Sequence, residues 1–104
     1  MTKTEHEQIL TDKDHVRAHF TVDKGEIVDF LVQYETLINE KRHPVVRFDA
    51  AHGFPHIDIL HFDGRKDKYS LAHLTSNDAL TMAQLDVGQN WDRYREKFLK
   101  GIKQ

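Results

Sequence analysis

The sequence VVRFDAAHGFPHIDILH, residues 45–61, contains two strand-like runs joined by a His-Gly corner. Alternate residues of a β-strand lie on the same face of its sheet. Arg47 and Asp49 therefore share a face of the first run, and His56 and Asp58 share a face of the second run. If the two runs pair, these four side chains form a compact acid–base cluster, which is the best indication of a functional site in the chain.

The segments before this sequence have the same strand periodicity. Apolar residues alternate with polar ones over residues 16–22 and again over residues 28–34, and a period of two is typical of half-buried strands. The turn residues Asp23, Lys24 and Gly25 between these runs predict a hairpin, because glycine readily takes the positive φ that such turns require.

The runs within residues 45–61 and the segment after them complete the predicted sheet. We expect a third strand over residues 45–50 and a fourth over residues 55–62, and the pair Asp63-Gly64 is a strong turn signal after it. A short fifth strand is predicted over residues 69–74. On the third and fourth strands, the apolar positions expected to face the core are Val46, Phe48, Ile57 and Ile59.

The C-terminal segment changes from strand to helix periodicity. Residues 75–78 are Thr, Ser, Asn and Asp, which are residues typical of a helix N-terminus. After them, apolar residues recur at helical spacing and form one stripe: Leu80, Ala83, Val87, Trp91, Tyr94, Phe98 and Ile102. We expect one long helix, weakened at Gly88, with this stripe packed on the apolar face of the sheet.

These patterns predict an α+β fold: an antiparallel meander of four to five strands with a long C-terminal helix packed on one face. The chain has 104 residues, which is the length of one ordinary domain. We expect a flexible N-terminal segment over residues 1–12 and a single domain over residues 13–104.

Composition excludes several classes of protein. The formal net charge is −2, and no block of Lys and Arg indicates a nucleic-acid-binding tail. The chain has no cysteine, so it forms no disulfide and no thiolate zinc site. No apolar run approaches the ~18–20 residues that cross a bilayer, and the N-terminal residues lack the apolar core of a secretory signal. We expect a cytoplasmic protein with no membrane partner.

The predicted sheet face opposite the helix is rich in groups that titrate or bind anions: Arg17, His19, Asp29, Gln33, Glu35, Arg47, Asp49, His56 and Asp58. Our leading hypothesis is metal-free acid–base chemistry on a phosphodiester, which needs no cofactor.

In this hypothesis each member of the cluster has a role. Arg47 holds a phosphate through its planar guanidinium, and His56 transfers a proton near neutral pH. Asp49 or Asp58 orients the imidazole. His52, beside Gly53 at the corner, supplies a second proton donor.

Three alternatives stay open at this point. The ligand types in His52, His56, His61 and the two aspartates suit zinc or manganese, although a regular strand directs His56 and His61 to opposite faces. The polar face or an exposed edge strand can instead dock a partner without chemistry. Finally, the cluster can be cross-strand ion pairing that only stabilises the sheet, by ~0–1 kcal/mol per pair.

The signature RxDxxHGxPHxD over residues 47–58 resembles that of small uncharacterised prokaryotic proteins in a domain-of-unknown-function family. The segments 79–83 and 90–99 are similar to the C-terminal part of the same family. This resemblance implies one compact domain and assigns no activity.

The same signature is more distantly similar to TumE-type toxins of toxin–antitoxin pairs, with Arg47, Asp49, His52 and His56 at matching positions. Asp58 stands where those toxins have a further histidine. The similarity implies a ribonuclease-like, RNA-directed activity and an antitoxin-like protein partner. The sequence leaves homo-oligomer formation open.

Overall fold

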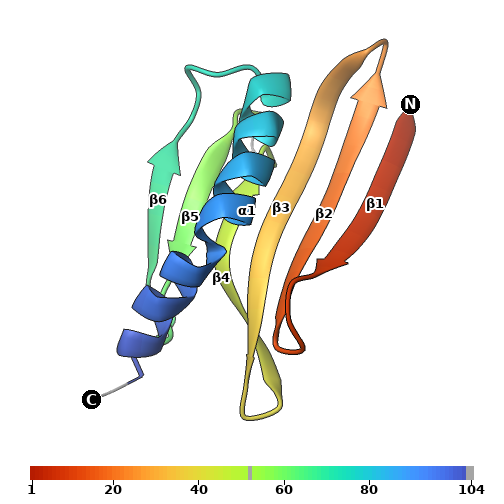
Figure 1. The fold of residues 1–104 in the computed structure, drawn as a ribbon. Coiled ribbons are helices and arrows are strands. Elements are labelled where there is room, and N and C mark those ends of the chain that lie inside the picture. Colours follow the sequence, from red (N-terminus) through yellow and green to blue (C-terminus); the bar gives the residue numbers. More distant parts are fainter. Residues whose placement is uncertain (52, 103–104) are drawn as a thin grey trace.

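The computed structural model describes residues 1–51 and 53–102. Figure 1 shows one twisted sheet with a single long helix lying across one of its faces. The elements in chain order are β1 (Thr2–Ile9), β2 (Asp14–Asp23), β3 (Glu26–Ile38), β4 (Lys41–Asp49), β5 (His56–Leu60), β6 (Lys66–Ser70) and α1 (Ser76–Lys100).

The sheet is an antiparallel meander in which every strand pairs with the next one along the chain. The predicted α+β class and C-terminal helix are confirmed, but the predicted number of strands was too low, because the sheet has six. The additional strand is β1, which lies within residues 1–12, the predicted flexible N-terminal segment. Every residue of β1 is exposed, so this edge strand lacks the apolar alternation that marks a half-buried strand.

The strand after the Asp63-Gly64 turn also differs from the prediction. Residues 66–70 form β6, whereas the fifth strand was expected over residues 69–74. The turn after β5 is tight: the amide of His61 donates to the carbonyl of Arg65 at 2.9 Å, and Gly64 has a φ of +94°. Pairing therefore resumes directly at Lys66, opposite Leu60. All of β6 is exposed, so its sequence also lacks the apolar alternation of a half-buried strand.

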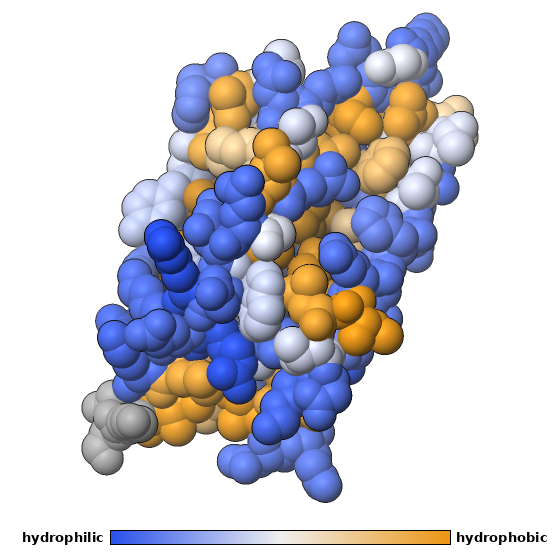
Figure 2. All heavy atoms as spheres, viewed as in Figure 1, coloured by the Kyte–Doolittle hydropathy of each residue, from blue (hydrophilic) through white to orange (hydrophobic). Residues whose placement is uncertain are grey.

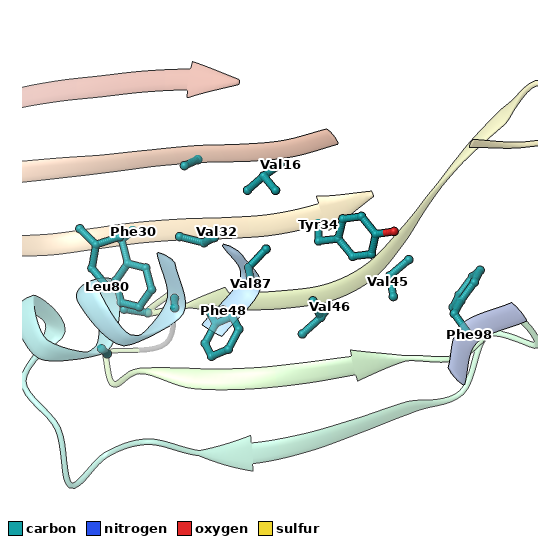
Figure 3. Close-up of a cluster of buried hydrophobic side chains, with 14 residues drawn as sticks. Val16, Phe30, Val32, Tyr34, Val45, Val46, Phe48, Leu80, Val87 and Phe98 are labelled. Atoms are coloured by element: carbon teal, nitrogen blue, oxygen red, sulfur yellow. The ribbon is translucent and has the colours of Figure 1, made fainter. Parts of the chain in front are cut away.

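The hydrophobic core lies between α1 and the middle of the sheet. Figure 3 shows side chains of the central strands and of α1 pointing into this layer. Phe30, Val32, Val46 and Phe48 are fully buried there. Burial of each such side chain contributes about 1.5–3 kcal/mol. The helix residues in the core are Ala79, Leu80, Ala83, Val87 and Phe98.

The helix begins where the sequence predicted and continues through Gly88. Thr75 is the N-cap, and its hydroxyl accepts a hydrogen bond from the backbone amide of Asp78 at 3.1 Å. Seen from the helix side, the surface is mostly hydrophilic, with hydrophobic patches beside the helix (Figure 2). No helix in the described part of the chain is long and apolar enough to cross a membrane.

A buried carboxylate fastens the helix to the sheet. Asp14, which is 4 % exposed, accepts hydrogen bonds from the hydroxyls of Tyr34 at 2.6 Å and Thr36 at 2.9 Å. The hydroxyl of Thr11 donates to Oδ2 of Asp14 at 2.6 Å. Nε of Arg95 on α1 lies 3.3 Å from Oδ1 of Asp14. Burial alone raises the pKa of Asp14, but these hydrogen bonds and the charge of Arg95 outweigh it and lower the pKa.

Candidate functional site

The sheet face opposite the helix carries two rows of side chains that cross the strands and are polar except for Leu31. The strand pairings place these residues beside one another. The first row is Glu7, Arg17, Gln33, Arg47, Asp58 and Lys68, and the second is Glu5, His19, Leu31, Asp49, His56 and Ser70.

The hairpin of β4 and β5 aligns the residues singled out by the sequence. Asp49 pairs directly with His56, and Arg47 pairs directly with Asp58. The loop between the strands is ordered near its start, because the backbone amide of Ala51 donates to Oδ1 of Asp49 at 3.1 Å. Side chains directly opposite on one face have Cβ atoms about 4.5–5.5 Å apart, so the register alone brings these groups together.

Two carboxylates converge on one ring nitrogen in this hairpin. Nε2 of His56 lies 3.0 Å from Oδ1 of Asp49 and 3.8 Å from Oδ2 of Asp58. Asp49, His56 and Asp58 are 8 %, 2 % and 2 % exposed. The three ligand-type atoms all lie within 4.8 Å of one another, so they form one compact and buried group, which we call the Asp-His-Asp cluster.

The cluster has more negative charge than its own groups neutralise. One N–H of an imidazole serves one carboxylate well, and even a protonated His56 balances only one of the two aspartates. No described residue donates a hydrogen bond to Oδ1 of Asp58, although that atom is buried. A buried carboxylate oxygen without a donor is costly, which indicates that the cluster is built for a positively charged partner.

Phe54 covers one side of the cluster. Its ring meets the ring of His56 edge-on, with centroids 6.1 Å apart, and Phe54 itself is 43 % exposed. Among the three cluster residues, Asp49 has the most accessible side chain, at 11 %. The cluster is therefore reached from the side of Asp49.

A second network lies beside the cluster and holds Arg47. Nε of Arg47 donates to Oε1 of Gln33 at 2.6 Å, and the amide nitrogen of Gln33 donates to Oε2 of Glu35. Glu35 is 3 % exposed and pairs with Arg17 at 3.7 Å and with Arg42 at 3.8 Å. The network thus runs across three strands, from β4 to β2.

The structure brings most of the predicted site residues together. Arg47, Asp49, His56 and Asp58 share one face of the hairpin, and His52 lies outside the described residues. His61 does not join them, because its Nε2 lies 2.7 Å from Oδ2 of Asp67 on β6. The strand periodicity had already placed His56 and His61 on opposite faces.

The sequence did not predict the role of Gln33 and Glu35 in holding Arg47. The available signal was their strand parity, which put both on the same face as Arg47. Beyond them, over β1 to β4, the same face has a hollow of about 370 Å³. Its polar lining includes Glu5, Glu7, Arg17, His19, Glu35 and Arg42.

Comparison with known proteins gives a family and no activity. A family model described as "Domain of unknown function (DUF7718)" matches residues 1–104. No curated protein and no solved structure matches the chain. None of these comparisons confirms the similarity to TumE-type toxins.

Proposed function

Because the chain belongs to DUF7718, a family whose description assigns no activity, we propose its function from the cluster itself: the protein binds a divalent metal ion. The ligands are Oδ1 of Asp49, Nε2 of His56 and Oδ2 of Asp58. The observation that carries the proposal is the approach of two buried carboxylates to one imidazole nitrogen.

The distances suit coordination. Two ligands at about 2.1 Å from an ion, and about 90–109° apart, lie about 3.0–3.4 Å from each other. The two separations from Nε2 of His56 are 3.0 Å and 3.8 Å. The first separation lies in this range, the second exceeds it by a few tenths of an ångström, and the three ligand atoms all lie within 4.8 Å of one another.

The donor set selects the class of ion. One imidazole and two carboxylates suit Mn²⁺ or Zn²⁺, since imidazole favours transition metals and carboxylates favour harder cations. A divalent ion also balances the two carboxylates while His56 stays neutral, which is the form that ligates metals. Three protein ligands leave at least one coordination position open, as in catalytic rather than structural sites.

The direct test is a Mn²⁺ titration followed by electron paramagnetic resonance, in which bound Mn²⁺ loses the signal of the free ion. We expect one ion per chain for the wild type and loss of binding in Asp58→Asn. The control is Asp67→Asn, which removes the carboxylate of another His–Asp pair, His61 with Asp67, in the next hairpin, between β5 and β6. Free Mn²⁺ at every ratio, or equal binding by both variants, contradicts the proposal.

Metal-free acid–base chemistry on RNA is the second candidate. It is supported by the contact of 3.0 Å between His56 and Asp49, since a carboxylate beside an imidazole can orient a general base. It ranks second because one carboxylate is enough to orient a general base, whereas two approach Nε2 of His56. RNA cleavage that survives EDTA and disappears in His56→Ala would favour this mechanism over the metal site.

A further inference from the structure

The guanidinium of Arg47 is held in place while most of its donors stay available. Its Nε donates to Gln33, yet no ion pair joins its terminal nitrogens to a carboxylate within the described residues. Asp58 stands directly opposite Arg47 on β5. A bidentate pair with a carboxylate is the usual partner of a guanidinium, so its absence here leaves both terminal NH₂ groups for a ligand.

The orientation of Gln33 follows from the chemistry of its two neighbours. Arg47 only donates hydrogen bonds, and a charged Glu35 only accepts them. The amide of Gln33 must therefore turn its oxygen to Arg47 and its nitrogen to Glu35, as it does in the structure. Glu35 is buried between Arg17 and Arg42. The position of Glu35 therefore fixes the hydrogen-bonded chain that runs from it through Gln33 to Arg47, which we call the relay.

Arg47 lies next to the proposed metal ligands on the same face. It precedes Asp49 by two residues on β4 and pairs across the strands with Asp58. A metal at the cluster and the terminal NH₂ groups of Arg47 therefore present two positive groups to one small ligand. Such a ligand needs one oxygen for the open metal position and two further oxygens for the guanidinium.

We infer that this ligand carries a phosphate group, bound jointly by the metal and by Arg47, with Gln33 and Glu35 as positioning residues. The inference rests on the proposed metal site and names its ligand class. A tetrahedral phosphate offers enough oxygens for both partners, whereas a carboxylate has only two. A metal ion with an arginine clamp is also a general way to neutralise a phosphate and polarise it.

The experiment measures how far protein-bound Mn²⁺ broadens the ³¹P signal of inorganic phosphate. The protein is in excess over Mn²⁺, so that the ion is bound to it. The wild type loaded with diamagnetic Zn²⁺ in place of Mn²⁺ gives the baseline. We expect strong broadening for the wild type and about tenfold weaker phosphate binding in Arg47→Gln, the loss expected for a charge-assisted hydrogen bond. Dimethyl phosphate in a second arm has only two unesterified oxygens, so we expect less broadening of its signal than of inorganic phosphate; broadening of neither one overturns the inference.

Two variants separate positioning from general electrostatics. Gln33→Met removes the hydrogen bonds of Gln33 to Arg47 and to Glu35 at similar volume, and we expect it to weaken phosphate binding several-fold while the Mn²⁺ affinity of the folded protein stays unchanged. Lys68→Gln removes a charge from the residue paired with Asp58 on its other side. If phosphate binding depends on the guanidinium of Arg47 and not on positive charge in general, Lys68→Gln binds phosphate as the wild type does.

The outcomes of the two proposals are distinguishable. Mn²⁺ binding without phosphate broadening, or equal phosphate binding in Arg47→Gln and Lys68→Gln, overturns the phosphate inference and leaves the metal site intact. Absence of Mn²⁺ binding by the wild type overturns both.

Discussion

Arg47 and Asp58 are direct cross-strand partners on β4 and β5, yet they form no ion pair among the residues that the structure describes. Each instead has its own neighbours: Arg47 bonds to Gln33, and Asp58 lies 3.8 Å from His56. A face arranged for stability alone would pair these opposite charges. Their separation supports a division of the face into an anion-binding part and a cation-binding part.

The first prediction concerns the cost of the buried carboxylate of Asp58. In EDTA, Asp58→Asn is expected to be more stable than the wild type by about 1–3 kcal/mol, because a neutral amide replaces a charge whose Oδ1 lacks a donor. Mn²⁺ at a hundredfold excess over its dissociation constant adds about 2.7 kcal/mol to the wild type only. Urea unfolding with and without Mn²⁺ measures both effects. If Asp58→Asn is less stable than the wild type in EDTA, the buried carboxylate of Asp58 does not destabilise the fold.

The second prediction concerns the fastening of α1 to the sheet. Asp14→Asn should lower the free energy of unfolding by about 2–3 kcal/mol, because the hydroxyl donors and Arg95 lose a charged acceptor. Asp12→Asn is the matched control, since Asp12 is exposed in the turn just before β2 and should change stability by less than about 0.5 kcal/mol. Equal effects of the two substitutions would remove this role from Asp14.

The third prediction is the pH dependence of that same contact. The pKa of Asp14 is lowered below 3.8 in the folded protein, so its charged form stabilises the fold at higher pH and the contribution is lost as pH falls through the folded pKa. The stability difference between wild type and Asp14→Asn should be constant above about pH 5 and shrink at pH values below 3.8. A difference that persists undiminished at the lowest pH where both variants fold contradicts this assignment.

The fourth prediction concerns Gly88 in the middle of α1. A Cβ built at Gly88 meets no atom within 4 Å, so Gly88→Ala should stabilise the protein by about 0.5–1 kcal/mol through helix propensity alone. Gly64 provides the contrast, because its φ of +94° is one that alanine rarely adopts. Thermal unfolding should show a higher melting temperature for Gly88→Ala and a lower one for Gly64→Ala.

The sequence predicted the elements with a buried face and failed where burial was absent. The alternation around Val16 and Phe30, and the helical stripe through Val87, identified their elements. β1 and β6 are exposed throughout, so they carried no such pattern. Strand parity placed Arg47 and Asp49 on one face, but only the register across the hairpin brings Asp49 to His56. The roles of Asp14 and Gln33 depend on contacts between strands, which a single strand's pattern does not encode.

All three proposed metal ligands lie on one hairpin, within residues 49–58. Closing so short a loop costs little chain entropy, and contacts between neighbouring strands form early in folding. The site can therefore assemble before α1, the last element of the chain, has docked on the sheet. A metal that binds this hairpin would stabilise the folding transition state almost as much as the native state. We expect Mn²⁺ to speed folding of the protein more than it slows unfolding.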